Sequence, residues 1–216
     1  MEHRVSGSWN CRHEPTAGCI FCSRGRCALA KCGTPGFCAY IIRKKKMTDE
    51  QFIKRCYELA INAGKKGFDT FGAVLVHNGN ILKEAENTSD YEKKIFGHAE
   101  FNLVHKCANK YSDDVLAESV LYTSCAPCER CLAAIASLGV RKVVCGVSYK
   151  EFSKLTPVDY EPVDREGLLA KLGIKMTLKE SVLEDEGMHV FEWWGGEYRP
   201  LEELIAEMDE VKKGKR

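Results

Sequence analysis

Residues 127–131 read Pro127-Cys128-Glu129-Arg130-Cys131, a stretch that joins a proline to two cysteines three residues apart. A proline suits the start of a helix, because its ring presets the backbone and it has no N–H group to leave unpaired. In such a helix the two cysteines are three residues apart, so both sulfurs lie on one face. They also lie near the positive end of the helix dipole, which favours thiolates. Two thiolates that converge on one point are typical of a metal site.

A second stretch, His98-Ala99-Glu100, lies at another predicted helix start, 30 residues before Cys128. Only one predicted strand separates the two helices, so their N-termini can lie side by side. His98 would then complete a set of three ligands, and three protein ligands leave zinc one open position for water, as in catalytic sites. A structural site has no use for Glu100, whereas beside such a water a carboxylate can take up a proton and deliver it to a leaving amine. The residues therefore predict one catalytic Zn²⁺ with Glu100 as the proton carrier.

The sequence around these two stretches alternates between helical and strand patterns. Apolar residues recur at helical spacing or in short β-branched runs, and Asn78-Gly79 is a strong hairpin signal between two of the runs. Because strands that alternate with helices favour a layered sheet, we expect an α/β fold of three α-β-α layers with five strands. The expected helices cover residues 48–63, 98–110, 126–138, 165–172 and 200–212, and the expected strands cover residues 71–77, 80–86, 120–124, 141–147 and 174–180.

The charges divide the chain into two parts. The 216 residues include 44% hydrophobic and 29% charged residues, as in an ordinary globular protein, and the net charge is only +1. Residues 1–46, however, carry nine Lys/Arg against two Asp/Glu, a net +7, so residues 47–216 carry a net −6. Because phosphates attract cationic side chains, contacts with nucleic acid would be confined to the first part. We predict a Cys-rich basic extension of residues 1–46 and a catalytic domain of residues 47–216.

The sequence argues against a membrane or secreted protein. No apolar run approaches the roughly 18 residues of a membrane span, and no charged start leads into an apolar stretch as in a secretory signal. We therefore expect a cytoplasmic protein whose twelve cysteines are metal ligands or reduced thiols.

Half of the twelve cysteines lie in the first 38 residues. Four of them could bind a second, structural zinc, although their spacing matches no established zinc module. These four are Cys19, Cys22, Cys27 and Cys32. The alternative is that residues 1–46 are not part of the natural protein, since Met47-Thr48-Asp49-Glu50 looks like an ordinary start. The mass of the native protein would distinguish a start at Met1 from one at Met47.

Together, the two metal stretches resemble the signature of the zinc-dependent cytidine/nucleobase deaminase superfamily, in which His-x-Glu is followed by Pro-Cys-x-x-Cys. Residues 71–76 are similar to the family's first strand, and residues 121–128, Leu-Tyr-Thr-Ser-Cys-Ala-Pro-Cys, look most like the guanine deaminase branch. The resemblance covers about residues 48–180. It implies a cytidine deaminase-like fold with a mixed sheet, one zinc on His98, Cys128 and Cys131, and hydrolytic deamination with Glu100 as the catalytic residue.

The same resemblance implies which residues face the substrate. Asn87 falls where the family places an asparagine that hydrogen-bonds the base, and the alternative is a loop asparagine that holds its own turn. Phe152 and Trp193-Trp194 match positions where relatives bring an aromatic ring to the base, and core packing is the alternative for each. Cys125 forms a second C-x-x-C with Cys128, and we interpret it as a pocket-wall thiol. The predicted substrate-binding residues are Asn87, Ala99, Phe71, Ser124, Cys125 and Phe152.

Three departures from the family pattern leave the substrate open. Ala126 stands where the family often has Glu, Thr70 where many members have Pro, and Ala136-Ser137 where some guanine deaminases have a Trp. We expect a deaminase of a free nucleobase or a similar small amino-heterocycle, with guanine ahead of cytosine. The alternatives are a tRNA adenosine deaminase anchored by residues 1–46, and a zinc-stabilised binding protein without catalysis. The resemblance also implies a homodimer or a larger assembly.

Overall fold

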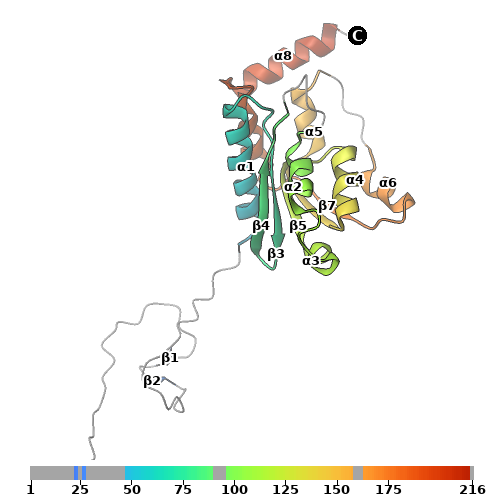
Figure 1. The fold of residues 1–216 in the computed structure, drawn as a ribbon. Helices are drawn as coiled ribbons and strands as arrows, with labels where there is room; N and C mark the ends of the chain where they lie inside the picture. Colours follow the sequence, from blue (N-terminus) through green and yellow to red (C-terminus); the bar gives the residue numbers. More distant parts are fainter. Residues whose placement is uncertain (1–21, 24–25, 28–46, 90–95, 158–162, 215–216) are drawn as a thin grey trace, which may run out of the picture. The chain divides into compact units, whose positions relative to one another are not determined.

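The computed structural model describes residues 22–23, 26–27, 47–89, 96–157 and 163–214 (Figure 1). The chain divides into two compact units, Met1–Lys44 and Lys45–Arg216. In the first unit, β1 (Cys22–Ser23) and β2 (Arg26–Cys27) pair antiparallel, with Cys22 opposite Cys27. The two other cysteines of the predicted second zinc site, Cys19 and Cys32, lie outside the described residues, so that site stays a prediction.

The second unit is built on one mixed sheet of five strands in the order β4-β3-β5-β6-β7. β3 pairs antiparallel with both β4 and β5, whereas β5, β6 and β7 run parallel. This confirms the expected α/β fold with a five-stranded mixed sheet. The strands are β3 (Gly72–His77), β4 (Asn80–Glu86), β5 (Val120–Cys125), β6 (Lys142–Val147) and β7 (Thr177–Lys179).

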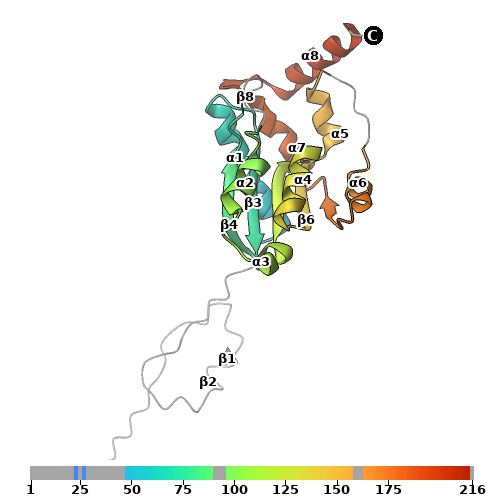
Figure 2. The ribbon, with the colours of Figure 1, turned by 45° about the vertical axis from the view of Figure 1, so that its right-hand side comes forward.

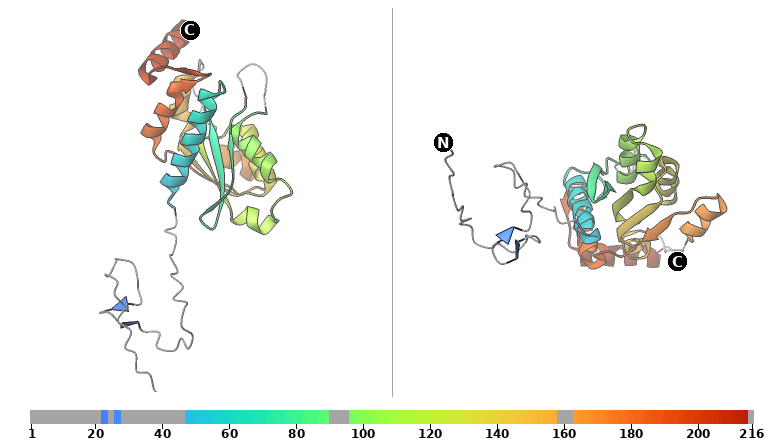
Figure 3. Two further views of the ribbon diagram at one scale, coloured as in Figure 1. Left: turned by 60° about the vertical axis from the view of Figure 1, so that its left-hand side comes forward. Right: turned by 90° about the horizontal axis from the view of Figure 1, so that it is seen from below.

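Helices cover both faces of this sheet (Figures 1 and 3). Because alternate residues of a strand point to opposite faces, Val74 and Val76 pack in one core with α1 (Asp49–Lys65), and Ala73 and Leu75 pack in another core. The second core holds the apolar residues of α2 (Ala99–Cys107) and α4 (Glu129–Leu138), together with Leu116 of α3 (Asp113–Glu118) and Leu169 of α6 (Arg165–Lys171). The result is the expected three-layer arrangement.

Two predicted helices have different ends in the structure. The helix expected to reach Lys110 ends at Cys107, because Ala108 leaves the helical conformation and Asn109 has a positive φ of 60°. The helix expected to begin at Ala126 begins at Glu129, because Cys128 is its extended N-cap residue and the N–H group of Ala126 instead bonds to the carbonyl of Val147 at 2.8 Å. The strand expected over residues 174–180 is limited to β7.

Several short elements lie between β6 and β7 or follow the sheet. They are α5 (Tyr149–Phe152), η1 (Ser153–Leu155), α7 (Glu184–Met188), η2 (His189–Glu192), β8 (Trp193–Trp194) and β9 (Glu197–Tyr198). The predicted last helix is α8 (Leu201–Gly214), and none of its residues is fully buried. Figure 2 labels α7 and α8, the two α-helices that follow β7 in the sequence. Among the described residues, no helix is both long and apolar enough to span a membrane.

The strand directions determine where a site can form. β4 and β5 are both antiparallel to β3, and β6 and β7 are parallel to β5, so the carboxyl ends of four strands meet at one edge of the sheet. The start of β3 lies at the same edge. Ligands of α/β proteins commonly bind at this edge, because the loops that follow the strands converge there.

Candidate metal centre and active site

The predicted metal ligands meet at this edge. His98 is the residue before α2, Cys128 is the N-cap residue of α4, and Cys131 lies one turn further along α4. The His98 Nδ1 atom is 3.8 Å from the Cys128 Sγ atom and 3.5 Å from the Cys131 Sγ atom. Among the described residues, these three form the group whose ligand atoms lie within 4.8 Å of one another.

The spacing of the three donors fits a zinc ion. Zn–S bonds of about 2.3 Å and Zn–N bonds of about 2.0 Å in a tetrahedron put sulfur and nitrogen about 3.5 Å apart. The two measured separations, 3.5 and 3.8 Å, agree with this value. Nδ1 is the imidazole nitrogen that faces the sulfurs. A histidine nitrogen with two thiolates would hold zinc and leave one coordination position for a non-protein ligand.

The pKa values of the two thiols of this site are shifted in opposite directions. Hydrogen bonds with Cys131 and with His98 lower the pKa of Cys128, despite the burial of its sulfur. The neighbouring Cys128 thiolate and burial both raise the pKa of Cys131. When Cys128 and Cys131 share one proton, the pair carries one negative charge. A metal cation that displaces this proton would be held by two thiolates.

Glu100 is the second residue of α2 and is only 4% exposed. Its Oε1 atom accepts a hydrogen bond of 2.9 Å from the hydroxyl of Thr123 in β5. Its carboxyl group also interacts with Cys131 and raises the pKa of that thiol. Burial raises the pKa of Glu100, and the hydrogen bonds to its carboxylate act in the opposite direction. Glu100 is therefore a buried carboxyl group held beside the ligand set, as a proton carrier must be.

Aromatic rings gather at the same edge of the sheet, at the start of β3. The Phe71 ring lies 5.5 Å from the ring of Phe152, 5.7 Å from that of Phe191 and 5.7 Å from that of Trp194. We refer to these four residues as the aromatic cluster. Phe191 is buried, and the other three are partly buried. Trp193, by contrast, packs on Tyr198 and under the Lys65 ammonium group, so of the two tryptophans it is Trp194 that belongs to the cluster.

The other predicted substrate residues lie at the same edge but already have protein partners. The Asn87 side chain is fully buried and donates to the carbonyl and the hydroxyl of Ser89 at 3.1 and 2.9 Å. The Ser124 hydroxyl accepts a hydrogen bond of 3.1 Å from the Gly72 N–H group. Ala99 is buried at the start of α2. Cys125 is buried beside the aromatic cluster, and burial raises its pKa well above the usual value, so it stays a thiol.

Arg165 also lies at this edge, and no motif in the sequence predicts this position. Its side chain is 6% exposed, and its Nη1 atom donates to Glu180 at 3.1 Å. Its Nε atom is 3.7 Å from a carboxylate oxygen of Glu129, the residue after Cys128, and its guanidinium lies over the ring of Tyr149. Nε and Nη2 have no hydrogen-bond partner within the described part of the chain. A single Arg on a short helix belongs to no motif, so sequence patterns do not predict its place at this edge of the sheet.

Comparison with known proteins agrees with this geometry. Residues 46–147 match the family described as the cytidine and deoxycytidylate deaminase zinc-binding region. This region, just under half of the chain, is similar to the zinc-dependent cytidine/nucleobase deaminase superfamily. The matched residues include the three ligands, Glu100 and the first four strands of the five-stranded sheet.

Members of this superfamily with different substrates are similar to the chain. The guanine deaminase of Bacillus subtilis is 39% identical over 92 residues, which are 41% of this chain and 58% of the relative. The tRNA-specific adenosine deaminase of the same species is 34% identical over 98 residues, which are 45% of this chain and 61% of the relative. The chain thus spans about three fifths of the length of these relatives. The structure of a guanine deaminase from Nitrosomonas europaea shares the fold, with a TM-score of 0.57 at 21% identity over 74% of this chain and 85% of that one.

Proposed function

We propose that this protein is a zinc-dependent hydrolase that deaminates a free nucleobase or a similar small amino-heterocycle, with guanine favoured over cytosine. The observation that carries the proposal is the buried carboxyl group of Glu100 beside the ligands His98, Cys128 and Cys131. A structural zinc site needs the three ligands, but it gains nothing from a buried acid whose burial is costly.

The roles of the residues follow from their positions. A zinc ion held by His98, Cys128 and Cys131 would supply the acidity that brings the pKa of a water molecule from about 16 toward 7. Glu100 takes one proton from the attacking water and passes it to the ring nitrogen. It then takes the second proton from the hydroxyl group on the ring carbon and delivers it to the leaving amine. The hydroxyl of Thr123 holds the Glu100 carboxylate at 2.9 Å, so the acid faces the reacting atoms in one orientation. Ammonia leaves, and a carbonyl group replaces the amine.

The preference for a small neutral base has two supports. Residues 47–216 carry a net −6, which disfavours a polyanion at this domain. The aromatic cluster offers ring faces and edges against which a planar heterocycle could pack. Asn87 is our candidate for a hydrogen bond to the base, and its amide would exchange its bonds to Ser89 for bonds to the substrate. Guanine is preferred because the guanine deaminase of Bacillus subtilis is 39% identical over the matched residues.

A tRNA adenosine deaminase is the second candidate. It is supported by the similarity to the tRNA-specific adenosine deaminase of Bacillus subtilis and by the net charge of +7 on residues 1–46. Salt-sensitive tRNA binding that is lost on deletion of residues 1–46 would support this candidate. The absence of tRNA binding at low salt would exclude it. The same deletion should leave the deamination of a free base unchanged.

The substitution Glu100→Gln tests the enzyme against a binding protein without catalysis. Glutamine keeps the size of the side chain but cannot carry a proton. We expect the variant to retain one zinc per chain and to lose about 100-fold or more of ammonia release. The assay should cover a panel of bases, nucleosides and pterins. If the zinc-loaded wild-type protein releases ammonia from none of them, the enzyme proposal fails.

The proposal also covers the localisation, the zinc content and the assembly of the protein. We infer a cytoplasmic protein with one catalytic zinc that assembles as a homodimer. The assembly is inferred because the family usually forms its pocket near a subunit interface. Light scattering of the zinc-loaded full chain would give the mass of the assembly, and a monomer would contradict this inference.

A further inference from the structure

Asn102 lies on α2, four residues after the metal ligand His98, and its side chain reaches back over the start of the helix. Its Nδ2 atom is within hydrogen-bonding distance of three oxygens. These are the carbonyl of Glu86 at 2.9 Å, the hydroxyl of Thr88 at 3.0 Å and the carbonyl of Gly97 at 3.1 Å. One side-chain amide therefore contacts both the end of β4 and the residue before His98.

The contacted segments also touch each other. The Thr88 N–H group donates to the carbonyl of Gly97 at 2.8 Å. A Cβ atom at Gly97 would lie 2.5 Å from the Ser89 nitrogen, so only glycine permits this approach. The segment at the end of β4 (residues 86–89) and the segment before α2 (residues 96–98) are therefore in contact. We call them the two flanks, and Asn102 bridges them from the helix.

One flank determines the position of the zinc ligand. The Gly97 carbonyl belongs to the peptide group that precedes the His98 Cα atom, and it is held by both the Asn102 side chain and the Thr88 N–H group. The carbonyl of His98 itself accepts a hydrogen bond of 2.8 Å from the Asn102 N–H group. The peptide groups on both sides of His98 are therefore anchored to Asn102, which restricts the direction of the imidazole.

The other flank carries the candidate base contact. Asn87 lies between Glu86 and Thr88, and both of these residues accept hydrogen bonds from Asn102. The Asn87 N–H group bonds to the carbonyl of Phe71, a member of the aromatic cluster, at 2.9 Å. A shift of this flank would move the Asn87 side chain relative to the metal ligands.

We propose that Asn102 is a positioning residue that couples the zinc ligand His98 to the substrate-facing Asn87. The part that concerns Asn87 rests on the proposed function, whereas the part that concerns His98 does not. The role needs an amide, because all three contacted atoms can accept hydrogen bonds and two of them are carbonyl oxygens that can only accept. An aspartate has nearly the same shape, but it would turn an oxygen without a proton toward these two carbonyls.

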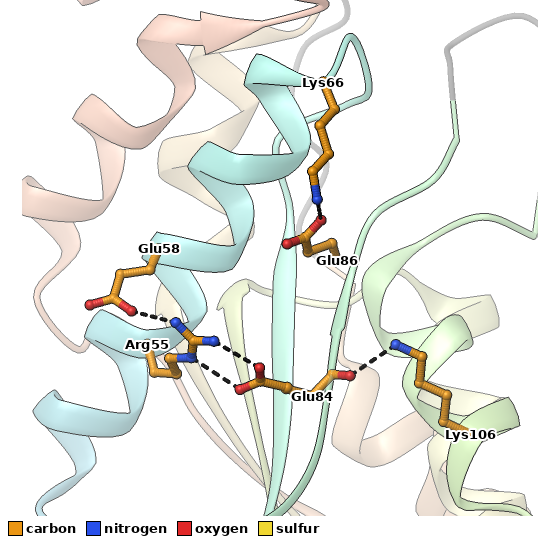
Figure 4. Close-up of polar contacts among 6 residues, drawn as sticks. All are labelled: Arg55, Glu58, Lys66, Glu84, Glu86 and Lys106. Carbon is orange, nitrogen blue, oxygen red and sulfur yellow. Dashed lines mark hydrogen bonds and ion pairs between the residues drawn. The ribbon is translucent and has the colours of Figure 1, made fainter.

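Lys106 provides a matched control on the same helix. Its Nζ atom donates to the carbonyl of Glu84 at 3.0 Å (Figure 4). Glu84 lies two residues before Glu86 in the edge strand β4. Glu84 is also held by Arg55 from α1 (Figure 4). Lys106→Met therefore removes a bond from α2 to the edge strand without touching either flank that Asn102 bridges.

The experiment compares Asn102→Asp and Lys106→Met in the zinc-loaded full chain. Zinc affinity is measured by competition with a chelating dye, and KM and kcat are measured from ammonia release with guanine. We expect Asn102→Asp to weaken zinc binding about tenfold, as is typical for residues that orient metal ligands. At saturating zinc, we expect its KM to rise about tenfold while kcat changes less than threefold. Lys106→Met should stay within about twofold of the wild type in all three values.

The proposal is overturned if Asn102→Asp binds zinc with wild-type affinity, or if Lys106→Met weakens zinc binding as much as Asn102→Asp does. If Asn102→Asp does not fold, Thr88→Val replaces it, since it removes one acceptor and keeps the Thr88 N–H bond to Gly97. The expected loss of zinc affinity is then about threefold, and an unchanged affinity contradicts the proposal. If the wild type releases no ammonia from guanine, the proposed function is in question, but the zinc measurement still decides the role of Asn102.

Discussion

Gly97 offers a direct test of the close contact between the two flanks. In Gly97→Ala, the new Cβ atom would lie 2.5 Å from the Ser89 nitrogen, 2.8 Å from the carbonyl carbon of Thr88 and 2.9 Å from the Ser89 Cα atom. All three are backbone atoms, so no side chain can rotate away to relieve the clash. Gly97 is not among the residues with positive φ, so the expected cost is steric and does not come from the backbone conformation.

The cost can be worked out from these distances. Ordinary contact begins near 3.4 Å, so the backbone at residues 88–89 must move by several tenths of an ångström up to about 1 Å. Overpacking of this kind costs about 1–3 kcal/mol. The 2.8 Å bond from the Thr88 N–H group to the Gly97 carbonyl would be weakened as well, at about 1 kcal/mol. We expect Gly97→Ala to lower the free energy of unfolding by about 2–4 kcal/mol.

Urea unfolding, followed by tryptophan fluorescence, measures this loss with a chelator and with saturating zinc. Because the clash moves the peptide group before His98, we expect zinc affinity to fall about tenfold, which adds about 1.4 kcal/mol to the loss in zinc. Gly214→Ala is the control, since its Cβ atom would have no neighbour within 4 Å, and it should change stability by less than about 0.5 kcal/mol. A Gly97→Ala variant as stable as the wild type would contradict the predicted clash. An equal loss of stability with and without zinc would show that the clash leaves the position of His98 unchanged.

Two further predictions concern the metal and pH. Cys131→Ser should abolish stoichiometric zinc binding, whereas Cys107→Ser, at an equally buried thiol outside the ligand set, should cost stability but keep one zinc per chain in a metal analysis. Hydrogen bonds from Lys179 and Tyr122, both at 2.7 Å, lower the pKa of Asp49. Its folded-state pKa lies below the unfolded value, so its stabilisation is complete above about pH 4 and is lost as the pH falls through the lowered folded value. Urea titrations should therefore show Asp49→Asn to be about 1–2 kcal/mol less stable than the wild type at pH 7. This difference should shrink as the pH falls below about 4, and a difference independent of pH would contradict the assignment.

Much of the architecture is local and could be predicted. Asn78-Gly79 allows a tight turn with positive φ, and the structure has both residues in that conformation between β3 and β4. The Phe52 to Ala63 periodicity marks α1, and its N-terminus follows Thr48, whose N–H group bonds to Gln51. These features depend on residues a few positions apart, so a single sequence contains all the information that they need.

The misplaced helix ends show the limit of local patterns. Pro127 predicts a helix start, but the carbonyl of Val147 binds the Ala126 N–H group and keeps the chain extended until Cys128. A partner more than twenty residues away therefore decides where α4 begins. The same holds for Arg165, whose partners Glu129 and Glu180 come from two other segments of the chain.

Local patterns were enough to predict the candidate ligands and the candidate acid, because His98-x-Glu100 and Cys128-x-x-Cys131 each place their side chains through the geometry of one helix start. The surroundings of these residues depend on the tertiary fold. It places Thr123 of β5 beside Glu100 of α2, and Trp194 from near the end of the chain beside Phe71. It also gave Asn102 three acceptors on two flanks that no periodicity connects. The physical reason is that a ligand motif needs only the regular spacing of a helix, whereas an orienting contact depends on which strand ends the sheet places side by side.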